Sequence, residues 1–191
     1  MPLAPPPGPP PAPALAPALA PALALRIDRS WDGAPAAPEE QATVRLQRDG
    51  SGLRLEVEAP FHGDPSPACA PGPTWALWEH EVVELFLLGA DDHYLEVELG
   101  PNGHYLVLLL HGVRNITRRL LPLEVQATVT GARWTASAHL PAALLPPGPH
   151  RVNATACHGL GQTRRYLAWT PMPGPSPDFH RLEHWPAVVL P

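Results

Sequence analysis

The sequence contains no lysine, and its 13 Lys and Arg residues are all arginine. This absence excludes chemistry that depends on a Schiff-base lysine or on the lysine of a P-loop. The formal net charge is −5, and nucleic acids or anionic membranes normally bind to a basic patch. We therefore expect neither a nucleic-acid partner nor a membrane partner.

Cysteine and long apolar runs are also scarce. Cys69 and Cys157 are too few for a disulfide scaffold, and we expect two reduced thiols rather than one bridge. No segment reaches the ~18–20 uninterrupted apolar residues that a membrane span requires. The first 25 residues are rich in proline and alanine, with no basic residue before Arg26. These features predict a cytoplasmic protein with a disordered tail over 1–25 and one domain over 26–191.

From residue 42 onward, apolar residues recur with a period of two. Such alternation is typical of strands that bury one face. The predicted strands cover 42–47, 53–59, 81–88, 94–99, 105–111, 123–129, 133–140, 152–156 and 165–169. About nine short strands at this spacing predict an all-β fold, an antiparallel two-sheet β-sandwich.

The pair Asn102-Gly103 lies between two of these alternating runs and favours a two-residue hairpin turn. With this turn, Leu99 lies opposite Leu106 and Val97 lies opposite Leu108. The strand over 81–88 is apolar on both faces, so we expect it to be central in its sheet.

Glu84, Glu96 and Glu98 are predicted to share one face if the strands that carry them are neighbours. Carboxylates that close to one another raise each other's pKa unless a cation or a hydrogen-bond donor compensates for them. Three kinds of partner remain open: arginine, a cation such as calcium, or the hydroxyl groups of a ligand. Structural pairing with arginine is favoured over ligand hydroxyls, and ligand hydroxyls over metal. The candidate arginines are Arg114, Arg118, Arg119, Arg164 and Arg165.

The signals for catalysis are weak. Glu96 and Glu98 are two apart on a strand, roughly 6.5–7 Å at the backbone. That spacing overlaps the separation in an inverting glycosidase, but any Glu-x-Glu strand has it. His180 and His184 have the spacing of half a zinc site, yet prolines flank them closely and we favour a packing role. We expect no catalytic residues, no metal ligands and no required cofactor, with calcium as an alternative.

Tryptophan at strand ends offers another kind of contact. The phase of Trp134 predicts a core residue, whereas Trp78 precedes one strand and Trp169 ends another. A tryptophan ring at such a place can stack on a sugar ring, although a core role is the more common one.

Several segments resemble an uncharacterised family of animal proteins of about this length. The resemblance rests on Leu77–Phe86, Tyr94–Leu99, Gly112–Asn115 and Pro177–Glu183, with Trp31-Asp32-Gly33 near the start. That family is in turn similar to the family 9 carbohydrate-binding modules and to DOMON-like β-sandwiches. The segments that resemble late strands of those modules are Trp134–Pro141 and Leu167–Pro171, followed by Phe179-His180.

The resemblance implies a two-sheet sandwich with a sugar site built from aromatic clamps, acids and arginine. It suggests Trp78 and Trp169 as clamps and Glu81 and Arg114 as polar contacts. We therefore expect a non-catalytic domain that binds a saccharide or another small polar ligand. The candidate ligand-binding residues are Trp78, Glu81, Glu84, Glu96, Glu98, Arg114, Trp169 and His180. The alternative is a protein-interaction or scaffold domain with a protein partner, and a glycoside-processing enzyme is less favoured.

Overall fold

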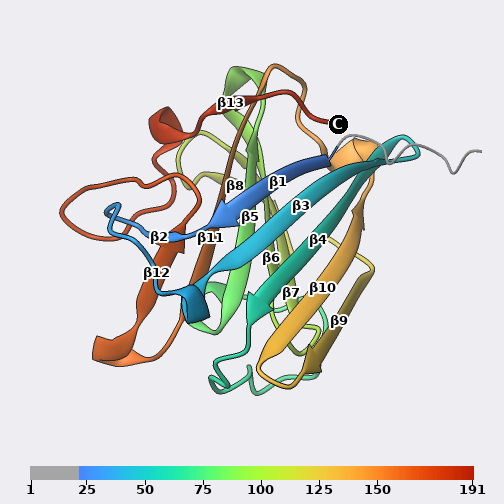
Figure 1. The fold of residues 1–191 in the computed structure, drawn as a ribbon. Helices are drawn as coiled ribbons and strands as arrows, with labels where there is room; N and C mark the ends of the chain where they lie inside the picture. The colour runs from blue at the N-terminus through green and yellow to red at the C-terminus, as the bar shows by residue number, and fades with distance from the viewer. Residues whose placement is uncertain (1–21) are drawn as a thin grey trace, which may run out of the picture.

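A computed structural model describes residues 22–191 as two antiparallel sheets packed face to face (Figure 1). The smaller sheet has five strands in the order β1-β3-β4-β10-β9. Their bounds are β1 (Ala22–Ile27), β3 (Ala42–Asp49), β4 (Gly52–Pro60), β10 (Arg133–Leu140) and β9 (Val125–Thr130).

The larger sheet has eight strands, in the order β2-β12-β11-β5-β6-β7-β8, with β13 paired to β11. Their bounds are β2 (Arg29–Ser30), β12 (Arg165–Ala168), β11 (His150–His158), β5 (Val82–Leu88), β6 (His93–Leu99), β7 (Tyr105–His111), β8 (Ile116–Arg119) and β13 (Ala187–Val188). The sandwich class is confirmed. The number of strands exceeds the predicted nine because β1 lies mostly within the stretch predicted as a tail, and because β2, β8 and β13 are too short to show an alternation.

All helices in the described range are single 3-10 turns in the connections between strands. They are η1 (Pro38–Glu40), η2 (Leu77–Glu79), η3 (Ala90–Asp92), η4 (Ala142–Leu144), η5 (Gly161–Thr163) and η6 (Leu182–His184). Within residues 22–191, no helix is long and apolar enough to cross a membrane.

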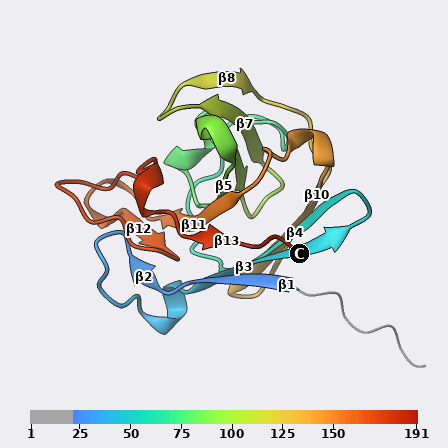
Figure 2. The same cartoon turned by 90° about the horizontal axis from the view of Figure 1, so that it is seen from above.

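Two apolar layers hold the fold together. The main core lies between the sheets and includes Leu46, Leu85, Val97 and the fully buried Trp134. A second layer covers the opposite face of the larger sheet, where Trp185 packs against Phe86 of β5 and Tyr94 of β6. The chain then ends beside the larger sheet, where β13 pairs with β11 (Figure 2). Because both of its faces are covered, every residue of β5 is buried, as its two-sided apolar sequence predicts.

The predicted register of the β6–β7 hairpin is wrong by one residue. Leu99 lies opposite Tyr105 and Val97 opposite Val107, because Gly100 and His104 close the ladder with a 2.9 Å hydrogen bond. The loop therefore has three residues, and Gly103, with φ of +82°, supplies the left-handed position that such a loop requires. A shift of one residue exchanges the faces of β7. Leu106, Leu108 and Leu110 consequently lie on the same face as Glu96 and Glu98.

The folded domain begins earlier than predicted. β1 starts at Ala22, and Leu25 is fully buried in the main core, so residues 22–25 belong to the domain. The rest of the predicted tail lies outside the described residues. Cys69 and Cys157 are unpaired.

Candidate functional site

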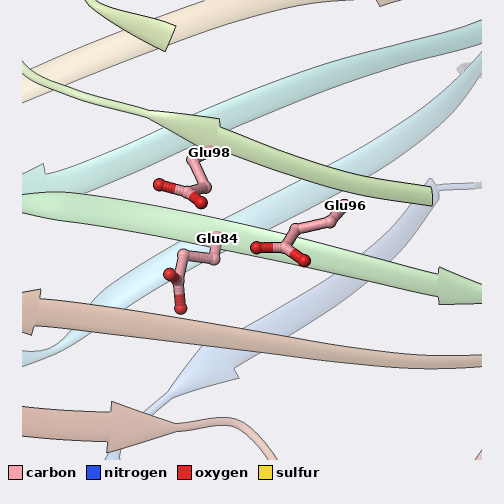
Figure 3. Close-up of side chains that lie close together, drawn as sticks. All are labelled: Glu84, Glu96 and Glu98. Atoms are coloured by element: carbon pink, nitrogen blue, oxygen red, sulfur yellow. The ribbon is translucent and has the colours of Figure 1, made fainter. Parts of the chain in front are cut away.

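Three glutamates converge on the face of the larger sheet that points away from the smaller one (Figure 3). Glu84 of β5 lies directly opposite Glu98 of β6, and Glu96 is two residues earlier on the same face. Each offers a carboxylate oxygen within 4.8 Å of the others, and at most 3% of each residue is exposed. The predicted grouping of these residues is confirmed.

These carboxyl groups have few partners. Thr155, opposite Glu84 on β11, donates its hydroxyl hydrogen bond to Glu84 Oε2. Both oxygens of Glu98 and Oε2 of Glu96 are buried without a hydrogen-bond partner in the part of the chain described. The Nε2 atom of His180 lies 4.0 Å from Glu96 Oε2.

The favoured prediction that arginines pair with this cluster is wrong for the described residues. Arg114 pairs with Asp178 at 2.8 Å, and Arg165 pairs with Glu40 at 2.7 Å. Both partners are exposed or near the surface, whereas an arginine that reached the cluster would have to be desolvated.

Burial determines the protonation of the cluster. It raises the pKa of Glu84 to about 7, and burial together with the Glu84 charge raises the pKa of Glu96 to about 8. Burial and both neighbouring carboxylates raise the pKa of Glu98 well above its ordinary value. Burial also lowers the pKa of His180 to about 4, so this histidine is neutral at physiological pH.

Above the glutamates lies a cavity of about 720 Å³. This volume is within the range of small-molecule sites, about 300–1,000 Å³. Glu84 and Glu96 line it, whereas Glu98 does not. Its aromatic lining consists of Trp75, Trp78, Phe86, Tyr166 and Phe179. The cavity thus combines acidic acceptors with aromatic surfaces.

Arg164 connects two walls of the cavity by hydrogen bonds. Arg164 donates hydrogen bonds from Nη2 to the carbonyl oxygens of Trp78 at 2.6 Å and His80 at 2.8 Å. Its Nη1 donates to the carbonyl of Gly159 at 3.0 Å. The segment that carries Trp78 is therefore fixed against the loop that follows β11.

A second connection fixes the opposite wall. The amide N–H of Arg114 donates to the Tyr94 hydroxyl oxygen at 3.1 Å, and that hydroxyl lies 2.8 Å from Nδ1 of His180. The tyrosine hydroxyl therefore connects the backbone of Arg114 to the ring of His180. The Arg114–Asp178 ion pair joins the same two segments at the surface.

Five of the eight predicted site residues line this cavity. They are Trp78, Glu84, Glu96, Arg114 and His180. Glu98 touches the other two glutamates but is not in the lining. The structure thus brings six predicted residues together.

Glu81 and Trp169 lie elsewhere. The Glu81 carboxylate accepts the backbone N–H groups of His62 at 3.0 Å, Gly63 at 3.0 Å and Asp64 at 3.3 Å, so it organises that loop. Trp169 packs against the main core. Neither residue lines the cavity.

Several residues that line the cavity were not predicted as site residues, among them Tyr166, Asp178 and Phe179. The alternation along β12 does indicate the position of Tyr166, because Leu167 points into the main core and the side chain of the preceding residue points to the opposite face. Asp178 and Phe179 lie in a loop without periodicity, so their place depends on how the chain returns over the sheet.

The fold and the cavity define the chain as a two-sheet β-sandwich domain with a ligand-sized cavity on the outer face of one sheet. In sequence it is similar to the mouse UPF0462 protein C4orf33 homolog, 43% identical over 170 residues that cover 84% of this chain and 88% of that protein. The human UPF0462 protein C4orf33 is 40% identical over 170 residues, covering 84% and 85%, and the Danio rerio homolog is 39% identical over 173 residues, covering 86% and 87%. The chain belongs to the UPF0462 family, which confirms the family resemblance.

No family model matches the sequence. Among solved structures, the chain resembles a protein from Bacteroides uniformis named a "putative carbohydrate-binding protein". The TM-score is 0.66 over 86% of this chain and 84% of that chain, with 17% sequence identity. At this identity the likeness establishes the fold alone.

Proposed function

We propose that the protein binds a saccharide or a similar polyhydroxyl ligand in the cavity above Glu84 and Glu96, without catalysing a reaction. The observation that carries the proposal is that the carboxyl groups of Glu84 and Glu96 and several aromatic side chains line one ligand-sized cavity. Sugars present hydroxyl groups at their rims and apolar C–H faces, and this combination suits such a site. The name of the Bacteroides protein of similar fold supports the same ligand class.

Each lining residue has a role that follows from its position. Trp78 is half-buried and offers a ring surface for stacking. Glu84 and Glu96 accept hydrogen bonds from hydroxyl groups, and the exposed Arg114 donates them at the rim. His180 places its Nε2 atom 4.0 Å from Glu96 Oε2.

The geometry argues against glycoside hydrolysis. The two carboxyl groups of a glycosidase flank the scissile bond from opposite sides, about 5–5.5 Å apart in retaining enzymes and about 6.5–9.5 Å apart in inverting ones. Here one oxygen from each glutamate lies within 4.8 Å of an oxygen from each of the others, and the three carboxyl groups share one sheet face. A sugar above that face meets all of them from the same side.

Binding is tested by isothermal titration calorimetry after a screen on a glycan array. We expect the change Trp78→Ala to reduce affinity about 5- to 150-fold, because stacking on an aromatic ring contributes on the order of 1–3 kcal/mol. Trp169→Ala is the matched control: it removes a tryptophan outside the cavity and should keep affinity while lowering stability. The proposal fails if no saccharide binds, or if Trp78→Ala and Trp169→Ala reduce affinity equally.

A location in the cytoplasm is part of the proposal. It is supported by the unpaired state of Cys69 and Cys157, which fits a reducing compartment. Fractionation of cells that express the full chain tests it, and recovery in a secreted fraction would contradict it.

A specific observation favours a second candidate, the docking of a protein partner. Large apolar side chains at the cavity rim are exposed, with Leu160 at 53%, Trp75 at 44% and Ile116 at 38%. Exposed apolar groups around a cavity are typical of interaction surfaces. This function predicts a defined partner whose binding is lost in Leu160→Asp, with no response to saccharides.

A further inference from the structure

We propose that Glu84, Glu96 and Glu98 bind a divalent cation of the calcium type at the floor of the cavity. The proposal deepens the proposed function, because it places an ion beneath the saccharide, but the cation can be measured with no saccharide present. An acidic cluster alone is not a metal site. Here both oxygens of Glu98 are fully buried without a hydrogen-bond partner among the described residues, and the Glu98 carboxyl group lies on the same sheet face as the other two glutamates (Figure 3).

The distances suit an ion of this size. Calcium binds oxygen at about 2.3–2.6 Å, which places ligand oxygens about 3.4 Å apart when adjacent and about 4.8 Å apart when opposite. The three carboxylates provide oxygens within 4.8 Å of one another. One ion at the centre can therefore contact all three groups with only small side-chain movements.

The position of Glu98 favours a single ion over an organic cation. An ammonium group on a ligand would enter from the cavity, where it meets Glu84 and Glu96. Glu98 does not line the cavity, so such a group would leave both of its oxygens unpaired. A bare or partly hydrated ion is small enough to reach all three carboxylates.

Among the described residues, no arginine forms an ion pair with the three glutamates. The charge of Arg164 acts on Glu84, but its guanidinium donates to three backbone carbonyls and lies 3.9 Å from Asp64 Oδ2. Arg114 is paired with Asp178, and His180 is neutral beside Glu96. The remaining neighbours from β11 are the hydroxyl of Thr155 and the buried thiol of Cys157.

The open side of this ion would face the cavity, because Glu84 and Glu96 line it. Calcium takes six to eight oxygen ligands, and three carboxylates leave positions free for water or for sugar hydroxyl groups. The ion would thereby connect the buried cluster to the ligand of the cavity.

Terbium luminescence tests the site in the full chain, because Tb³⁺ binds calcium sites and Trp75 and Trp78 of the same cavity can sensitise its emission. We expect saturable emission that calcium displaces. Glu98→Gln keeps the shape of the side chain and should weaken binding at least about 100-fold, more than the loss of an outer-shell partner typically costs. Glu124→Gln, which alters an exposed glutamate beside β9, is the matched control and should bind as the wild type does.

The absence of saturable emission from the wild type would overturn the proposal, as would unchanged binding in both Glu98→Gln and Glu96→Gln. Circular dichroism verifies that the variants are folded. Saccharide titration with and without a chelator separates the two proposals. Terbium binding without saccharide binding refutes only the proposed function, whereas saccharide binding without any terbium binding refutes only the cation site.

Discussion

The change Glu84→Gln tests the protonation of the buried cluster. Burial raises the pKa of Glu84 from its ordinary value of 4.5 to about 7. The native state therefore keeps a proton that the unfolded chain releases between these two pH values. A group with a raised native pKa contributes stability below its unfolded pKa and loses it as pH rises through the native pKa.

The size of the effect follows from the shift. One pKa unit corresponds to about 1.4 kcal/mol. The free energy of unfolding of the wild type should therefore fall by about 3 kcal/mol between pH ~4.5 and pH ~8 through Glu84 alone. That is a large fraction of a typical free energy of unfolding, about 5–15 kcal/mol. Glutamine retains an oxygen that can accept the Thr155 hydrogen bond and has no proton to release.

Urea denaturation at about pH 5 and pH 8, with a chelator present, measures this difference. The free energy of unfolding of the wild type should fall with pH by about 3 kcal/mol more than that of Glu84→Gln. The exposed Glu124→Gln should behave as the wild type does. An equal fall in the wild type and in Glu84→Gln would refute the reasoning, because it would show that Glu84 holds no extra proton in the native state.

Two further predictions concern the walls of the cavity. Glu81→Gln leaves one acceptor oxygen for the N–H groups of residues 62–64 and should lower the free energy of unfolding by about 2–4 kcal/mol, measured by urea denaturation; a change below about 0.5 kcal/mol would contradict this role. Arg164→Met preserves the apolar stem but removes three hydrogen bonds to carbonyls, so hydrogen exchange should accelerate at residues 78–80 and 159–164. Unchanged exchange there would show that the walls hold without the arginine.

Much of the candidate site is encoded locally. The period of two places Glu84 on one face of its strand and Glu96 and Glu98 on one face of the next. The apolar residues on both sides of β5 already indicate a central strand, and a central strand has neighbours on both edges. The grouping of the three acids needed one further fact, the pairing of β5 with β6, which the structure supplies.

What the partners of those acids are depends on the tertiary structure. Spacing along a strand does not specify where a guanidinium goes, and Arg164 bonds to carbonyls instead of to the glutamates. The register of β6 and β7 was decided by the geometry of the loop that closes at Gly100 and His104, since the sequence signal Asn-Gly is compatible with more than one loop length.

The sequence by itself determined the β-sandwich class and the face that Glu96 shares with Glu98, because alternation is a property of neighbouring residues, whereas the pairing of β5 with β6 added Glu84. Only the tertiary structure decided that the Glu81 carboxylate accepts backbone hydrogen bonds from residues 62–64 and that Trp169 packs against the main core. It also decided that the loop carrying Asp178 and His180 returns over the sheet to close the cavity. These outcomes depend on contacts between segments far apart in the chain, and no local pattern encodes such contacts.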